Sequence, residues 1–171
     1  RDIDSRLRSR GRFLLIRFLV RDLMVVVATV VSWWAFAAYS AGDNYLADIS
    51  GWVVGLLLGA CAYLAHEWSH YLGAVAMGSR VDVGENLASG FLFSFAAEGN
   101  SLSQFVVMSL AGFVATAGMV AFFYLGLPDD LLATRIARGS VVFLSLLGIV
   151  LELPLLTYGI VTRGVPKQVS V

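Results

Sequence analysis

The sequence predicts an all-α membrane protein with four transmembrane helices and both termini on the cytoplasmic side. Three observations predict it: the composition, four apolar stretches of spanning length, and an uneven distribution of Lys and Arg. Of the 171 residues, 58% are hydrophobic and 14% are charged, whereas soluble domains carry about 25% charged residues. The net charge of +0 argues against nucleic-acid binding. The lone Cys61 argues against a disulfide-stabilised secreted fold.

A helix needs about 20 mostly apolar residues to cross the hydrocarbon core of a bilayer. Four stretches have that length and are apolar on all sides, which is typical of spanning helices and not of surface helices or barrel strands. They cover residues 23–41, 51–78, 104–127 and 140–162. We therefore expect one four-helix domain over residues 23–162, with a basic segment 1–22 before it and a tail 163–171 after it.

Lys and Arg are concentrated on one side of these predicted spans. Seven arginines precede the first span, Arg80 lies between the second and third, and Arg163 and Lys167 follow the fourth. The loops on the other side contain Arg135 and Arg138. The positive-inside rule then places both termini in the cytoplasm.

The basic segment 1–22 has two interpretations. Arg17 and Arg21 interrupt an apolar run, which is typical of an interfacial helix on the inner leaflet. A simple topology anchor explains the same residues. On topology alone we expect the cytoplasmic membrane of a bacterium or archaeon.

Both histidines of the chain lie in the pentapeptide His-Glu-Trp-Ser-His, inside the second predicted span. His66 and His70 are four residues apart, so they share one face of a helix and can bind one metal ion together. Two imidazoles and a carboxylate favour zinc, and Glu67 can then take a proton from a zinc-bound water molecule. The alternative is a hydrogen-bonded polar patch that holds helices together.

A catalytic zinc ion needs a third protein ligand, and Glu152 is the leading candidate. It is the other ionisable side chain inside a predicted span, and at 1.5 Å rise per residue its depth differs from that of His66 by only ~4–5 Å. Pro154 would loosen the helix nearby, as happens around membrane ion sites. Alternatively, Glu152 is protonated or bonds a neighbouring helix. Glu85 and Asp82 are the other candidate ligands.

The stretch HEWSHYLGAVAMGSRV, residues 66–81, resembles the site-2 protease family of intramembrane zinc metalloproteases. It includes a small residue and a glycine four and eight positions after the second histidine, Ala74 and Gly78. Ala111-Gly112-Phe113 is similar to the family's later small-residue signature. The resemblance implies a motif on a transmembrane helix, a zinc cofactor and Glu67 as general base.

The chain departs from the family at the third ligand, which is an Asp in a Leu-Asp-Gly motif. Tyr158 falls near that position here, and Tyr is a poor zinc ligand, so Glu152 would have to substitute from one to two turns earlier. We also expect none of the extra domains that are usual in the family. This chain would be a minimal and divergent member.

The expected function is hydrolysis of peptide bonds in or near membrane-spanning segments, with a membrane protein or peptide as substrate and the lipid bilayer as surroundings. Residues 90–95, within the loop 79–103, have two interpretations. They form either a short strand, which could pair with an unwound substrate, or an amphiphilic loop that lies on the membrane. Two other functions stay open. One is a catalytically inactive relative that acts as a subunit or assembly factor of a membrane complex, and the other is a metal or proton transporter.

Overall fold

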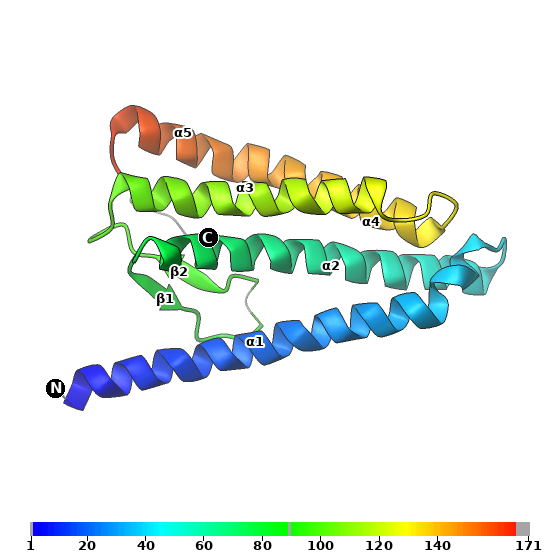
Figure 1. The fold of residues 1–171 in the computed structure, drawn as a ribbon, viewed down its shortest axis with the longest axis horizontal. Helices are drawn as coiled ribbons and strands as arrows, with labels where there is room; N and C mark the ends of the chain where they lie inside the picture. The colour runs from blue at the N-terminus through cyan, green and yellow to red at the C-terminus, as the bar shows by residue number, and fades with distance from the viewer. Residues whose placement is uncertain (1, 89, 167–171) are drawn as a thin grey trace.

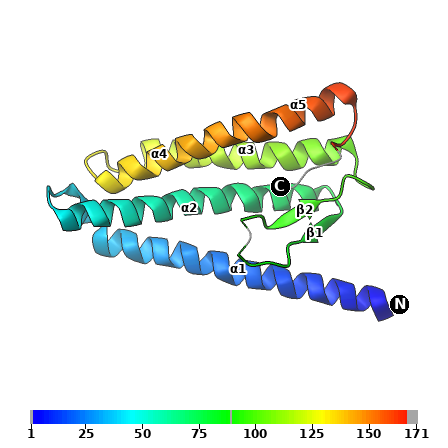
Figure 2. The same ribbon diagram turned by 180° about the vertical axis from the view of Figure 1, so that it is seen from behind.

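The chain folds into a bundle of long helices, described by a computed structural model for residues 2–88 and 90–166. Successive long helices run antiparallel, with α2 at the centre, α1 on one side of it, α3 and α4 packed against its other side, and α5 continuing from α4 (Figure 1, Figure 2). A π-helical turn joins α4 to α5 without a break. The helical elements are α1 (Asp2–Phe36), η1 (Ala37–Ala41), α2 (Tyr45–Ala76), α3 (Leu102–Leu125), α4 (Leu132–Leu147), η2 (Gly148–Glu152) and α5 (Leu153–Thr162).

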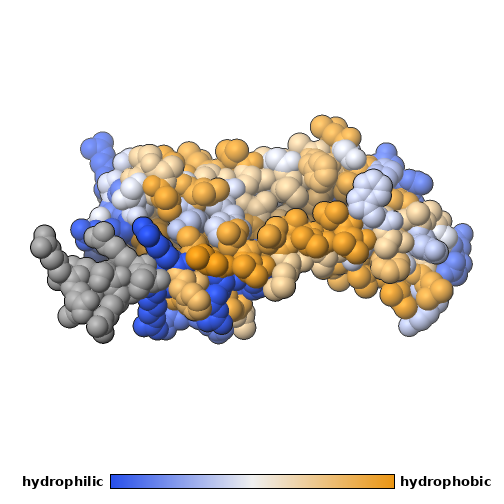
Figure 3. All heavy atoms as spheres, turned by 60° about the horizontal axis from the view of Figure 1, so that its bottom comes forward, coloured by the Kyte–Doolittle hydropathy of each residue, from blue (hydrophilic) through white to orange (hydrophobic). Residues whose placement is uncertain are grey.

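Among residues 2–88 and 90–166, three helical stretches are long and apolar enough to cross a membrane, and they correspond to three of the four predicted spans. They are Tyr45–Ala76, Leu102–Leu125 and Leu132–Thr162. On the face seen in Figure 3, hydrophobic side chains fill the middle of the molecule and hydrophilic ones gather at its two ends. This distribution fits a protein whose middle lies in hydrocarbon.

The first predicted span, 23–41, is divided between two elements. α1 ends at Phe36, and residues 37–41 form the 3₁₀ turn η1. α1 is not among the helices that meet the spanning criteria. It also continues unbroken through the expected boundary at residue 22, while Arg1, Lys167 and the end of the tail lie outside the described residues. The first predicted span, in α1, therefore stays a prediction, and so does the total of four spans.

The last span begins at Leu132, eight residues before the position 140 that the sequence predicted. Arg135 and Arg138, expected in the preceding loop, lie inside α4. The guanidinium group of Arg138 donates to the carbonyl oxygen of Phe123 at 2.9 Å and forms an ion pair with Asp129 at 2.6 Å. Because these contacts satisfy the charge at the end of the bundle, the helix can start before the apolar stretch.

Glycines on one face of α2 let α4 pack closely against it. A Cβ atom added at any of three glycines would lie within 2.6 Å of an α4 side chain. The pairs are Gly51 with Leu132, Gly55 with Ile136 and Gly59 with Ser140. Both helices advance by four residues per contact, so they run parallel and in register.

The loop between α2 and α3 contains a small antiparallel hairpin of β1 (Val81–Val83) and β2 (Phe93–Phe95). Of the two alternatives for residues 90–95, a short strand is present over Phe93–Phe95, and residues 90–92 are irregular. Phe93 and Phe95 are buried and Ser94 is exposed, so one face of β2 packs inward. The hairpin lies between α1 and α2 at one end of the bundle, and Phe18 of α1 joins its hydrophobic cluster (Figure 1). It therefore covers one side of α2.

Candidate metal centre

The two histidines of the motif lie one turn apart on α2 and are buried in the bundle. His66 is 4% exposed and His70 is 1% exposed. Their rings meet edge to face with centroids 4.3 Å apart, and their Nε2 atoms are 2.9 Å apart. The predicted shared face is thus present.

Helix α3 provides hydrogen-bond acceptors for the Nδ1 atom of each ring. Nδ1 of His70 lies 2.8 Å from the carbonyl oxygen of Met108. Nδ1 of His66 lies 3.1 Å from the carbonyl oxygen of Gly112 and 2.8 Å from the hydroxyl oxygen of Thr116. Since a carbonyl oxygen can only accept, Nδ1 of each ring must carry the hydrogen. In the neutral rings, both Nε2 atoms then present lone pairs.

Glu152 lies across from these two Nε2 atoms. Its Oε1 atom is 3.0 Å from Nε2 of His66, and its Oε2 atom is 3.3 Å from Nε2 of His70. The predicted similarity in depth of Glu152 and His66 is confirmed. Two imidazole lone pairs and a carboxyl group thus converge. Their lone pairs would repel one another unless a hydrogen atom or a cation lies between them, so the cluster needs either an added proton, on a ring or on the carboxyl group, or a metal ion.

The donor set and its spacing fit zinc. Two ligand atoms that each lie ~2.0–2.1 Å from a tetrahedral zinc ion are roughly 3.3–3.4 Å apart. The ligand atoms of His66, His70 and Glu152 all lie within 4.8 Å of one another. The distance between the two Nε2 atoms of the histidines is 2.9 Å. Small side-chain movements would accommodate the ion. The Nδ1–H bonds to α3 are the outer contacts that fix metal-binding imidazoles in proteins.

The other candidate ligands lie elsewhere. Glu85 forms an exposed ion pair with Arg10 at 2.9 Å, and Asp82 is exposed on β1. Within residues 2–88 and 90–166, the cluster of His66, His70 and Glu152 is the one group of three such side chains close enough to share a metal ion. Tyr158 is 60% exposed on α5.

Glu152 is presented by the π-helical turn η2, of which it is the last residue. The backbone N–H of Leu153 donates to the carbonyl oxygen of Gly148, five residues earlier, which defines the wide turn. Pro154 follows and has no N–H to continue the ladder. π-Helical turns inside α-helices often coincide with functional sites. The sequence predicted a loosened helix near Pro154, and the wide π-helical turn just before Pro154 is such a loosening.

Glu67 is buried on the side of α2 that the hairpin covers. It is 4% exposed, and its Oε2 atom accepts a hydrogen bond of 3.5 Å from the backbone N–H of Leu92. The hydroxyl group of Tyr63, one turn earlier on α2, donates to the carbonyl oxygen of Gly90 at 2.6 Å. The residues before β2 therefore lie directly against Glu67 and Tyr63.

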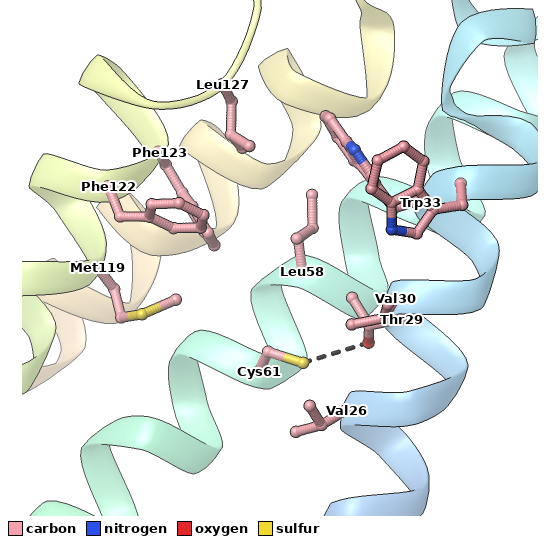
Figure 4. Close-up of a pocket in the computed structure, with 11 residues that line it drawn as sticks. Val26, Thr29, Val30, Trp33, Leu58, Cys61, Met119, Phe122, Phe123 and Leu127 are labelled. Atoms are coloured by element: carbon pink, nitrogen blue, oxygen red, sulfur yellow. Dashed lines mark hydrogen bonds between the residues drawn. The ribbon is translucent and has the colours of Figure 1, made fainter.

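An apolar cavity of about 270 Å³ lies between α1, α2 and α3. Val30, Leu58, Met119 and Phe123 line it, and the thiol of Cys61 at its wall donates to the hydroxyl oxygen of Thr29 at 3.2 Å (Figure 4). None of the motif residues nor Glu152 lines this cavity. It is separate from the metal centre.

Sequence reasoning did not place Met108, Gly112 and Thr116 at the site. The Ala111-Gly112 pair, noted above for its similarity to a family signature, is the one sequence signal that could have pointed here. A Cβ atom at position 112 would lie 2.2 Å from Cε1 of His70, so glycine is what lets α3 approach the ring. The backbone acceptors have no signature in the sequence.

No family model, no curated protein and no solved structure matches this chain. The resemblance of residues 66–81 to the site-2 protease family stays a prediction from those residues.

Proposed function

We propose that this chain is an intramembrane zinc metalloendopeptidase that hydrolyses peptide bonds in or near membrane-spanning segments. The observation that supports it is the convergence of two imidazole lone pairs and the Glu152 carboxylate, with Glu67 next to His66 on the same helix. A buried carboxylate and two imidazoles are costly at membrane depth, and binding a divalent cation offsets that cost.

In this proposal His66, His70 and Glu152 hold zinc, which when bound acts as a Lewis acid that acidifies water and polarises a peptide carbonyl group. Glu67 is the general base. Its carboxylate takes a proton from water and passes it to the leaving amine. The substrate backbone must unwind locally before it is attacked, because the hydrogen bonds of a helix occupy its carbonyl groups.

We also propose the finer topology: four spans, with α1 as the first, and both termini in the cytoplasm of a bacterium or archaeon. The motif lies toward the end of α2 that leads into the hairpin loop. On this topology water reaches Glu67 from the cytoplasmic side.

One observation favours a second candidate, an inactive relative that serves as a subunit or assembly factor. Glu67 is 4% exposed and its carboxylate is already bonded to Leu92. The two candidates differ in whether Glu67 performs chemistry, so the experiment must separate metal binding from cleavage.

The first measurement is the zinc content of protein purified from zinc-replete cells. Wild-type protein is expected to hold one equivalent, and Glu152→Ala is expected to lose most of it. Glu85→Ala is the matched control, because it removes an exposed carboxylate outside the cluster, and it should keep its zinc. A zinc-free wild-type protein would refute the proposal.

The second measurement is cleavage of a probe in lipid vesicles. The probe is a single-span peptide of about 25 residues, mainly Leu and Ala, with an Asn-Gly-Pro sequence near one end to unwind it. Zinc-loaded wild-type protein should cleave it, and Glu67→Gln should bind zinc but not cleave. If both proteins bind zinc and neither cleaves, the inactive relative is the better description.

A further inference from the structure

Two side chains on one face of α2 bind a piece of backbone in the structure. Tyr63 and Glu67 are four residues apart, so they are neighbours on the helix surface. The Tyr63 hydroxyl donates to the carbonyl oxygen of Gly90 at 2.6 Å. The Glu67 carboxylate accepts from the N–H of Leu92 at 3.5 Å. Together they hold one carbonyl group and one N–H group that are two residues apart.

These two backbone groups are the ones that an extended peptide offers along one edge. In a strand, the carbonyl of one residue and the N–H of the residue two positions later point to the same side, which is how parallel strands bond each other. Both contacts of α2 are to main-chain atoms. An unwound segment of any sequence could replace the Gly90–Leu92 backbone at these two side chains.

Tyr63 and Glu67 lie where they can position a bound peptide beside the metal centre. Tyr63, His66, Glu67 and His70 lie within about one third of the helix circumference, at 100° per residue. A peptide held by Tyr63 and Glu67 therefore runs beside His66 and His70. The N–H that meets Glu67 is placed next to the group that passes a proton to the leaving amine in the proposed reaction.

We propose that Tyr63 is a substrate-binding residue, which holds a main-chain carbonyl of an unwound peptide while Glu67 meets the N–H two residues on, and that the Gly90–Leu92 backbone occupies this place in the structure. The inference rests on the proposed function and names its substrate class: an extended peptide recognised by its backbone. Substrate must displace residues 90–92 from Tyr63 and Glu67.

The experiment replaces Tyr63 with the photo-crosslinker p-benzoylphenylalanine in zinc-loaded Glu67→Gln protein, with the vesicle probe described above. Without the probe, crosslinks to the chain's own residues near 90–92 are expected. With the probe at saturation, these should fall at least threefold and a crosslink to the probe should appear. The same replacement at Tyr158, which is 60% exposed on α5, is the control. It should give no specific crosslink to the unwound end of the probe.

Deuterium exchange of peptides that cover residues 90–95 gives a second measurement that needs no crosslinker. Tyr63→Phe removes one hydrogen bond, so exchange there should rise by about three- to tenfold, and the probe should raise it in Glu67→Gln protein. Tyr71→Phe is the matched control, since the Tyr71 ring packs on Phe93 with centroids 5.6 Å apart. Its exchange should match that of wild-type protein.

The outcomes separate this inference from the proposed function. If zinc-loaded wild-type protein cleaves the probe but position 63 gives no probe crosslink and exchange at 90–95 is unaffected, Tyr63 does not bind substrate and the inference is overturned alone. If wild-type protein binds no zinc and cleaves nothing, the proposed function fails and takes the inference with it.

Discussion

The rings of His66 and His70 are oriented by carbonyl groups that already take part in a helix. The carbonyl oxygens of Met108 and Gly112 accept N–H groups within α3, and their second lone pairs take Nδ1–H of the histidines. This requires α3 to come very close to α2, which the missing side chain of Gly112 permits. Ring orientation is thus set by the approach of two backbones, and Thr116 adds one side-chain acceptor.

Removing the Thr116 hydroxyl should weaken zinc binding without unfolding the protein. Thr116→Val keeps the shape but loses the acceptor 2.8 Å from Nδ1 of His66. Because the carbonyl of Gly112 remains as an acceptor, we expect a loss of about tenfold in zinc affinity, at the low end for such outer contacts. Thr116→Ser should restore it. Competition with a chelator of known affinity measures the effect, and equal affinities in all three proteins would contradict it.

A methyl group at position 112 should displace His70 from the metal centre. The added Cβ of Gly112→Ala would lie 2.2 Å from Cε1 and 2.3 Å from Nε2 of the ring, so the ring must move. We expect zinc content well below one equivalent. Gly118→Ala is the control on the same helix, since its Cβ meets nothing within 4 Å. It should keep full zinc content and, as an exposed helical Gly→Ala change, be stabilised by up to about 1 kcal/mol.

At the scale of helices and strands, the spacing of the histidines was sufficient to predict their shared face on one helix. The apolar stretches were sufficient to predict that Glu152 lies at a similar depth on another helix. The depth of Glu152 followed from the rise per residue, because both helices run in the same direction. The start of α4 at Leu132 could not be predicted, since Arg138 is accommodated by carbonyl groups at the end of α3, Phe123 and Tyr124, that only the folded turn brings to it. The contact of Leu92 with Glu67 was missed for the same reason.

The glycine face of α2 should control both stability and the metal centre. In Gly55→Ala the added Cβ would lie 2.5 Å from Cβ of Ile136 and 2.7 Å from the carbonyl oxygen of Ala133, so α4 must move away. We expect a loss of about 1–3 kcal/mol in unfolding free energy. Zinc content should also fall, because Glu152 lies in the π-helical turn that continues α4 and would move with it.

The matched control for this change is Gly139→Ala, on α4 itself, where a Cβ meets nothing within 4 Å. It should unfold at the same or a higher denaturant concentration than wild-type protein. Denaturant unfolding in detergent micelles, with zinc content measured on the same samples, compares the two variants. Equal stabilities would show that α2 and α4 do not need their close approach.

At the scale of the whole molecule, α1 is the helix whose relation to the membrane matters most. Its aliphatic side chains are largely exposed, as at Leu23 and Met24 with 57% and 61%, which is typical of a lipid-facing helix. It also has polar contacts to α2, since Asp22, 5% exposed, accepts the indole N–H of Trp68 at 2.8 Å. Trp34, 83% exposed, lies near the end where α1 turns into α2, as expected for a membrane–water interface.

The number of spans can be decided by labelling single cysteines from one side of the membrane. In a Cys61→Ser background, one cysteine each replaces Arg10 in α1, Glu98 between α2 and α3, or Asp130 between α3 and α4. With four spans, a membrane-impermeant maleimide should label Asp130→Cys in intact cells and the other two only after permeabilisation. With three spans, α1 stays on the outer side, so Arg10→Cys would react in intact cells while Glu98→Cys would not. Because the arginines before residue 22 oppose transfer across the membrane, we expect the four-span pattern, in which Glu67 and the hairpin face the cytoplasm.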